Sequence, residues 1–187
     1  YSWSVFQDVQ ELIDLLGGRK KFTEKLDALF ATPTFEVDTN YYGFPLIRDA
    51  QTFHLGQYSQ GNEPAHHIPY LYSYAGEPWK TQYWVREVMD HLFDASPFGY
   101  PGDEDNGQMS AWYIFSALGF YPVCPVSGQY VLGSPLFKKV IVHLPKGKQI
   151  LINASNNNPK NRYVNMLKIN GVLYDKNWIN HKDLIKG

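Results

Sequence analysis

The chain has 187 residues and a formal net charge of −1, with 17 Lys and Arg against 18 Asp and Glu. This length suits one full domain or pieces of two, and the 44% of hydrophobic residues is enough for a packed core, which excludes bulk disorder. The balanced charge provides no basic surface to gather a polyanion, so no nucleic-acid partner is expected. No apolar run is long enough to predict a membrane span.

Aromatic residues make up 16% of the chain. Such a composition is common in sugar-binding proteins, because an aromatic face buries the apolar C–H patch of a pyranose. A core rich in tyrosine is the alternative, and composition alone leaves both open. Cys124 is the only cysteine, so the chain has no internal disulfide and no second thiolate for a zinc site.

Hydrophobic periodicity predicts five helices in the first two-thirds of the chain. Their expected ranges are 7–18, 20–32, 65–75, 78–93 and 109–119. Pro78 suits the first turn of its helix, where a missing N–H costs nothing. Between residues 34 and 61 no period survives, and a long aromatic loop of this kind is expected to be functional.

The last third of the chain is predicted to be antiparallel sheet. Alternating, β-branched stretches cover 140–144, 149–152 and 163–169, and Asn170-Gly171 is a strong hairpin signal. Helix pairs followed by strands favour a helical layer joined to a β-sandwich piece and argue against an alternating α/β fold. We therefore predict an α+β chain, helical over 1–122 and stranded over 123–187.

A first polar segment covers residues 60–67. Glu63 stands directly before Pro64, which favours an extended backbone at Glu63, so its carboxylate, the Asn62 side chain and nearby carbonyls can converge ahead of a helix. Oxygen ligands of this kind suit Ca²⁺. The alternative is that these groups cap the following helix.

Two adjacent histidines, His66 and His67, end this segment. Neighbouring residues on a helix face about 100° apart, so the two rings cannot chelate one metal as an i, i+4 pair does, which disfavours a zinc site. One ring can reach a ligand while the other packs. A buried, hydrogen-bonded core histidine is the simpler alternative.

A second polar segment contains three consecutive acids, Asp103, Glu104 and Asp105, between Gly102 and Gly107. Three adjacent carboxylates repel one another, and a cation or a proton-transfer role offsets that cost. Asp103 and Asp105 point the same way if the loop is extended, and such a pair could activate a water. Solvated loop acids are the alternative. The spacing fits no EF-hand, and the fingerprints of serine hydrolases, P-loop NTPases and dinucleotide-binding proteins do not occur.

Three strings occur in one order along the chain, at Gly61–His67, Tyr74–Gln82 and Gly102–Tyr113. With them the chain resembles, over its whole length, the exo-acting, calcium-dependent α-mannosidases of glycoside hydrolase family 92. The resemblance implies an N-terminal β-sandwich followed by an (α/α)6 toroid, with strands near the C-terminus. This chain would then be a fragment, namely part of the toroid followed by antiparallel sandwich strands.

The resemblance also implies roles for single residues. Family members invert the anomeric centre, which takes a general acid and a base on opposite sides of the sugar. By motif match Asp105 is the implied base, with Asp103 as its partner or alternate. Asn62 and Glu63 match the calcium segment, and Asp105 is implied to touch the ion or its waters. The implied substrate-binding residues are His66, His67, Trp79 and Gln108, although Trp79 could equally be a helix-packing residue.

The implied general acid lies in a Glu-Gly-x-x-Trp-Gln string just ahead of the segment that matches Tyr1. The 187 residues contain no such string, so we expect this chain alone to be inactive. The implied partners are mannose-containing glycans and the upstream portion of the same protein, and the implied location is secreted or periplasmic, in a bacterium. Two other function classes remain: a calcium-dependent glycan-binding module without catalysis, and a helical scaffold that is insensitive to a chelator.

Overall fold

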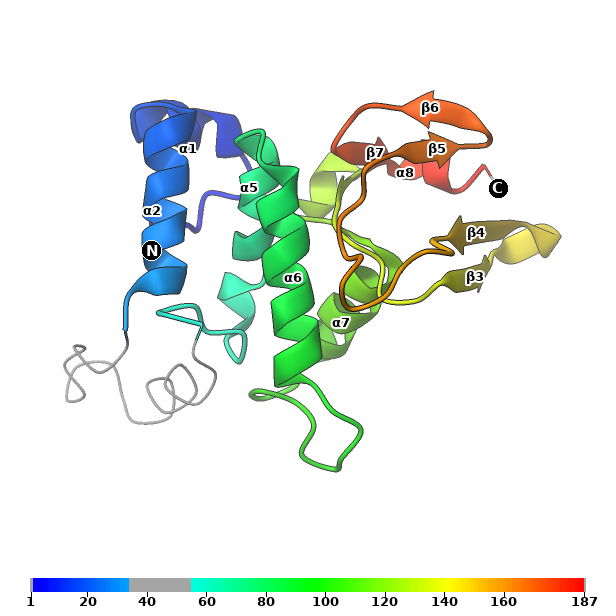
Figure 1. The fold of residues 1–187 in the computed structure, drawn as a ribbon, viewed down its shortest axis with the longest axis horizontal. Helices are drawn as coiled ribbons and strands as arrows, with labels where there is room; N and C mark the ends of the chain where they lie inside the picture. Colours follow the sequence, from blue (N-terminus) through cyan, green and yellow to red (C-terminus); the bar gives the residue numbers. More distant parts are fainter. Residues whose placement is uncertain (1, 34–54, 187) are drawn as a thin grey trace.

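The structure is a computed structural model that describes residues 2–33 and 55–186. Figure 1 shows helices over the first part of the chain and small sheets at the other side of the molecule, with α6 between α1 and α2 on one side and the strands on the other. The chain is therefore α+β with antiparallel sheets, as the sequence predicts.

The first two helices are α1 (Val9–Leu15) and α2 (Arg19–Ala31), and both predictions are confirmed. Asp8 caps α1 by accepting a hydrogen bond of 3.0 Å from the Glu11 amide. Gly17, at φ +88°, ends this helix in the left-handed conformation that glycine adopts without strain. Most of the aromatic loop predicted over 34–61 lies outside the described residues.

The prediction of one helix over 65–75 is wrong. The chain instead forms two 3₁₀ turns, η2 (Glu63–Ala65) and η3 (Ile68–Tyr70), and one short α-helical turn, α5 (Leu71–Tyr74). Pro64 and Pro69 are the second residues of η2 and η3. Because proline lacks the amide hydrogen and its ring clashes inside a helix, each one is accommodated only in the first turn of a new helical segment.

The longest helix, α6 (Pro78–Leu92), begins at its proline as predicted, and α7 (Gln108–Leu118) ends at Gly119 in the left-handed conformation, φ +97°. Both pack into one hydrophobic core with α2 and the turns around Tyr70. The largest side chains buried in that core are Trp112, Tyr70, Tyr72, Phe22, Ile13 and Leu26. Over residues 2–33 and 55–186, no helix has the length and apolarity needed to cross a membrane.

Two predicted hairpins are confirmed, and one strand is shorter than predicted. Strand β3 (Lys139–His143) pairs with β4 (Gln149–Asn153), and β5 (Leu167–Ile169) pairs with β6 (Val172–Tyr174) across a turn with positive φ at both Asn170 and Gly171. Strand β5 does not start at residue 163. The Val164 amide donates instead to Oε1 of Gln82 on α6, at 3.0 Å.

A three-stranded antiparallel sheet was not predicted. It has the order β1-β2-β7, with β1 at Phe120–Tyr121, β2 at Gln129–Leu132 and β7 at Trp178–Asn180. Short helical turns flank these strands: η4 (Pro125–Ser127), η5 (Pro145–Gly147) and α8 (His181–Leu184).

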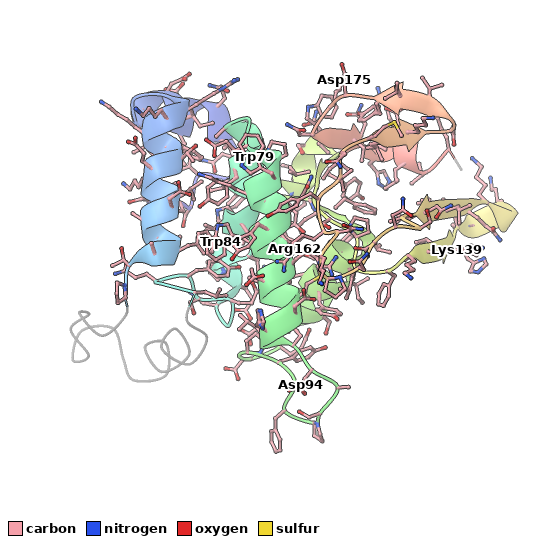
Figure 2. The ribbon with its side chains drawn as sticks, in the orientation of Figure 1. Trp79, Trp84, Asp94, Lys139, Arg162 and Asp175 are labelled. Carbon is pink, nitrogen blue, oxygen red and sulfur yellow. The ribbon has the colours of Figure 1, made fainter. Side chains whose placement is uncertain are left out.

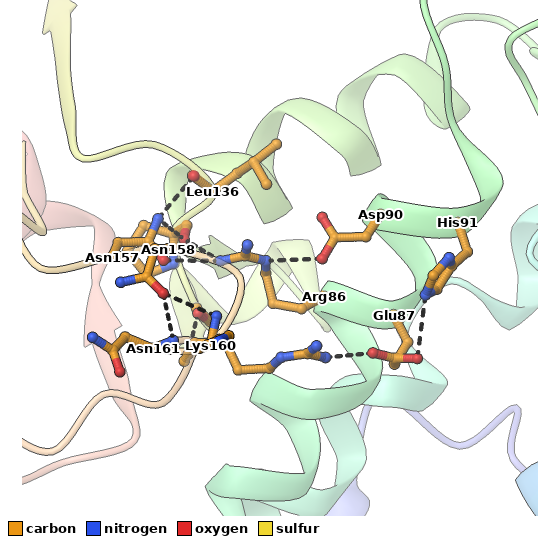
Figure 3. Close-up of polar contacts among 12 residues, drawn as sticks. Arg86, Glu87, Asp90, His91, Leu136, Asn157, Asn158, Lys160 and Asn161 are labelled. Carbon is orange, nitrogen blue, oxygen red and sulfur yellow. Dashed lines mark hydrogen bonds and ion pairs between the residues drawn. The ribbon is translucent and has the colours of Figure 1, made fainter.

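Polar side chains of α6 hold the segment that follows the helices (Figure 3). Arg86 is 3% exposed, and its Nη1 donates to the Pro135 carbonyl and to Oδ1 of Asn157, both at 3.0 Å. The next residue along the helix, Glu87, accepts from Arg162. The β-rich part is therefore fixed to α6 through buried backbone groups and charged side chains.

Candidate functional site

The two polar segments noted in the sequence touch in the structure. A Cβ on Gly102 would lie 2.5 Å from both the Cα atom and the carbonyl oxygen of Gly61. The two backbones are therefore so close that only glycine fits at position 102 without movement. Gln108, the first residue of α7, adds a long contact of 3.5 Å from its side-chain amide to the Glu63 carbonyl oxygen. The loop before η2 and the loop before α7 thus form one site.

Glu63 is where negative charge converges in this site. Its Oε1 atom is buried and has no hydrogen-bond partner among the residues that the structure describes. Burial raises the pKa of the Glu63 carboxyl, and the nearby charges of Asp105 and Asp103 raise it further. The arrangement favours a proton or a cation beside Glu63 over a free negative charge.

The backbone around Glu63 differs from the prediction. Asn62, not Glu63, has the extended conformation (φ −124°, ψ 110°), and Glu63 begins the 3₁₀ turn. Asn62 stands at the capping position of that turn, but its side chain makes no capping hydrogen bond. The capping alternative for Asn62 is therefore not realised, and its side-chain oxygen stays available to a ligand.

The sequence analysis expected Asp103 and Asp105 to point the same way if the loop is extended. The loop is not extended. Asp105 (φ +44°), Asn106 (φ +60°) and Gly107 (φ +88°) are all left-handed, so the chain turns sharply there. Both aspartates are exposed, and the charges of both act on Glu63. The two aspartates therefore act on Glu63 from a loop that ends in a tight turn, not from an extended loop.

The sequence did not predict that Glu104 makes contacts different from those of its two acidic neighbours. Its carboxylate accepts hydrogen bonds from the Ser110 amide at 2.9 Å and the Gly107 amide at 2.6 Å. The hydrogen bonds from Ser110, and after them the one from Gly107, hold the pKa of Glu104 below its ordinary value. The signal that could have revealed this role is an acid just ahead of a predicted helix start, where free amides collect.

The two histidines lie inside the core beneath the site. His66 is 1% exposed, and its Nε2 lies 2.9 Å from the Gln60 carbonyl oxygen. Burial lowers the pKa of His66 to about 4. The Trp112 indole donates to the His66 carbonyl at 2.9 Å, and Nε2 of His67 lies 2.6 Å from the Trp3 carbonyl oxygen. Both rings anchor the backbone here, and their contact with substrate stays a prediction.

Trp79 and Gln108 were the other predicted substrate contacts. Gln108 is exposed and belongs to the site, since its amide reaches Glu63. Trp79 is 52% exposed in the first turn of α6, and Figure 2 shows it at the end of that helix opposite Asp94, where the connection to the acidic loop begins. The contact of Trp79 with substrate stays a prediction.

The donor set fits part of a calcium site. Ca²⁺ takes six to eight oxygen ligands, and Glu63, Asp105 and Asn62 supply oxygens, with one buried Glu63 oxygen unpaired. Over the described ranges, no three His, Cys, Asp or Glu side chains group as a complete metal site. The remaining ligands would have to be carbonyl oxygens, waters or groups from another part of the protein.

The candidate site thus consists of oxygen donors from two loops of the helical part, which meet at Gly61 and Gly102. The family model of the glycosyl hydrolase family 92 catalytic domain matches residues 1–187. The chain therefore belongs to glycosyl hydrolase family 92, and the resemblance seen in the sequence is confirmed.

Three known proteins illustrate the match. An uncharacterized secreted glycosidase of Arthroderma benhamiae is 30% identical over 183 residues, which cover 96% of this chain and 21% of that protein. The family GH92 inverting mannosidase BT2199 of Bacteroides thetaiotaomicron is 46% identical with a TM-score of 0.84, over 100% of this chain and 26% of its own. The GH92 α-mannosidase BT3965 of the same organism is 41% identical, also with a TM-score of 0.84, over 97% and 22%. The chain thus spans about a quarter of the length of these relatives.

Proposed function

We propose that the protein containing this chain is an exo-acting, inverting α-mannosidase that hydrolyses α-linked mannose with the help of Ca²⁺. The observation that carries the proposal is the convergence of Glu63 and Asp105 from two loops whose backbones touch at Gly61 and Gly102. Solved relatives at 46% and 41% identity that are named as mannosidases support it.

Asp105 is the proposed general base. Inversion requires a carboxylate that takes a proton from a water on the face opposite the leaving group. Asp105 is exposed at the turn, so a water can reach it, and Asp103 stands two residues away as its partner or alternate. Gln108, whose side-chain amide lies 3.5 Å from the Glu63 carbonyl oxygen, is proposed to hydrogen-bond a sugar hydroxyl.

Asn62, Glu63 and Asp105 are the proposed calcium ligands within this chain. A bound calcium ion supplies positive charge that can hold two sugar hydroxyls and favour a flattened ring, which is catalysis by stronger binding of the transition state. Glu63 carries the buried oxygen without a hydrogen-bond partner. Burial and the nearby aspartates disfavour its charged form and raise its pKa, and a bound cation would stabilise that charged form.

The general acid and the rest of the sugar pocket are proposed to come from other parts of the protein. In this proposal residues 1–122 are a segment of an (α/α)6 toroid, residues 123–187 are strands that pack on the toroid and a β-sandwich, and the 187 residues alone are inactive. The partners are mannose-containing glycans and the upstream portion of the protein. A secreted or periplasmic location in a bacterium is proposed as well, and a secreted relative supports export.

The test uses the complete protein and an aryl α-mannoside. We expect turnover with calcium, loss of turnover after chelation, and a fall of at least about 100-fold in kcat for Asp105→Asn, in the range of general-base removal. Undiminished turnover in Asp105→Asn would remove it from the role of base. Calcium-dependent mannose binding by calorimetry without any turnover would favour the glycan-binding module, and indifference to the chelator would favour the scaffold.

A further inference from the structure

We propose that Glu104 is a positioning residue, whose carboxylate clamps the start of α7 and thereby holds Asp105 toward Glu63. This inference rests on the proposed function, because it assigns to the middle acid of the Asp-Glu-Asp run a role distinct from those of its neighbours.

The clamp uses both oxygens of the Glu104 carboxylate. Oε2 accepts from the Gly107 amide at 2.6 Å and Oε1 accepts from the Ser110 amide at 2.9 Å. The Glu104 carbonyl also accepts from the Met109 amide at 3.2 Å. Hydrogen bonds from amides to a charged carboxylate are stronger than those between neutral groups, so the first turn of α7 is tied to Glu104.

The three acids therefore face different surroundings. Asp103 and Asp105 are exposed, whereas Glu104 is half-buried with each oxygen already bound to a backbone amide. A carboxylate engaged in this way is turned toward the helix start. Of the three acids, Asp103 and Asp105 are therefore exposed to solvent, and Glu104 between them binds, and so anchors, the start of α7.

The anchor is needed because the backbone next to it is in a conformation that side chains disfavour. Asp105 and Asn106 both have positive φ, a region that residues other than glycine enter rarely. The amides of Gly107 and Ser110, which follow this turn, donate to the Glu104 carboxylate, which precedes it, and so hold its two ends together. Without these hydrogen bonds, the loop loses the contacts that select the left-handed turn.

A second anchor fixes the other end of the loop. Gly102 packs against the backbone of Gly61, so the loop enters next to Glu63, and the Glu104 clamp fixes where it leaves. Asp105 lies between these anchors, and its direction toward Glu63 follows from them. Loss of the clamp would free Asp105 without removing any proposed ligand.

The experiment compares Glu104→Ala with Asp94→Ala in the complete protein. Asp94 is a matched control, because it is also a carboxylate in the connection between α6 and α7 and accepts from a nearby amide, that of Ser96, at 2.6 Å. Calorimetric titration with calcium alone should show an affinity about 10- to 100-fold weaker in Glu104→Ala, the range seen when a residue that orients a ligand is lost. The kcat for an aryl α-mannoside should fall by a similar factor, and Asp94→Ala should change neither by more than about twofold.

A second variant removes the clamp from its donor side. Ser110→Pro deletes the amide hydrogen but keeps the Glu104 carboxylate, and proline is tolerated in the first turn of a helix. Ser110→Ala controls for loss of the hydroxyl, which contacts Tyr100 at 2.8 Å and also contributes a hydrogen bond to Glu104, while it keeps the Ser110 amide. Ser110→Pro should weaken calcium binding as Glu104→Ala does, and the double variant should be no weaker than the worse single one. Unchanged calcium affinity in a folded Ser110→Pro, alongside a loss in Glu104→Ala, would assign Glu104 direct contact with the ion and overturn the proposal.

Hydrogen exchange of the Gly107 and Ser110 amides gives a readout that needs neither metal nor substrate. Glu104→Ala should speed exchange at both amides while the exchange of the α6 core stays unchanged, and unchanged exchange at these amides would overturn the clamp. If the wild-type protein binds calcium but turns over no mannoside, the proposed function fails, and the calcium titration of Glu104→Ala still tests the role of Glu104. If the wild-type protein binds no calcium, hydrogen exchange at the Gly107 and Ser110 amides tests that role.

Discussion

The helical part of this chain and its two β-hairpins bury apolar side chains to very different extents. Val85 and Trp112 are wholly buried, whereas Leu151 on β4 is 60% exposed and Leu173 on β6 is 70% exposed. Each hairpin strand has one neighbour only, within the described chain, and two-stranded hairpins add little stability by themselves. The helical part therefore carries most of the stability of these 187 residues.

The candidate site belongs to the well-buried part. Glu63 lies at the start of the turns that lead to His66, and the acidic loop leads directly into α7, whose Trp112 bonds the His66 backbone. The site loops are exposed, but the elements at their ends are fixed in the core. We therefore expect substitutions in the helical core to alter the geometry of the site, and substitutions in the hairpins to leave it unchanged.

The largest expected effect is that of Trp112→Ala. This side chain is 0% exposed, stacks on Phe93 and donates to the His66 carbonyl. Its truncation should lower the free energy of unfolding by about 3–5 kcal/mol, measured by urea titration of the chain. A loss below about 1 kcal/mol would break the contrast between the helical part and the hairpins.

Acid should destabilise the helical part through His66. Its folded pKa is about 4, below the ordinary 6.5, because burial disfavours the charged ring. The folded state therefore binds a proton at His66 less readily than the unfolded state. The free energy of unfolding keeps its full value, as far as His66 is concerned, above about pH 6.5. It falls as pH drops toward 4, by about 3 kcal/mol in total. Urea titrations across this range should show the slope, and His66→Asn should flatten it. An equal slope in the variant would contradict the assignment.

An intermediate effect is expected where the two site loops touch. In Gly102→Ala the new methyl group would meet the Gly61 backbone at 2.5 Å, so the loops must separate, at a cost of about 1–3 kcal/mol. Gly133→Ala is the control, since its Cβ would meet the Tyr70 ring at 3.4 Å, an ordinary contact. Thermal unfolding of both variants makes the comparison, and equal melting temperatures would argue against close packing of the loops.

The smallest effect is expected in the hairpins. Leu151→Ala and Leu173→Ala should each change the free energy of unfolding of the 187-residue chain by no more than about 0.5 kcal/mol, as exposed positions usually do. A loss above about 2 kcal/mol in either variant would mean that the hairpins are buried by contacts that this chain makes in solution.

Local rules predicted the elements whose residues decide them locally. The stripe and Pro78 of α6, the Gly119 end of α7 and the Asn170-Gly171 turn all formed as expected. No continuous helix forms over 65–75, because Pro69 lies inside this range and Pro64 stands just before it, and each interrupts the helical hydrogen bonds. The three-stranded sheet was missed because its strands are two to four residues long and β7 joins from far along the chain.

The sequence nominated residues for the candidate site, whose roles stay predictions, but it did not predict the geometry of the site. Asn62, Glu63 and Asp105 were proposed from residue type and motif, but nothing in the sequence says that Gly102 rests on Gly61, since that contact joins two loops about 40 residues apart in the chain. The burial of His66 and the inward role of Glu104 likewise depend on partners brought in by the fold, the Gln60 carbonyl and the first amides of α7.

The most direct test of the account is a crystal structure of the complete protein soaked with calcium. We predict one calcium ion about 2.3–2.6 Å from a Glu63 carboxylate oxygen, the usual Ca²⁺–O distance, with Asp105 at the same ion or its waters. A calcium ion bound elsewhere, with Glu63 and Asp105 each facing bulk solvent in separate places, would contradict it.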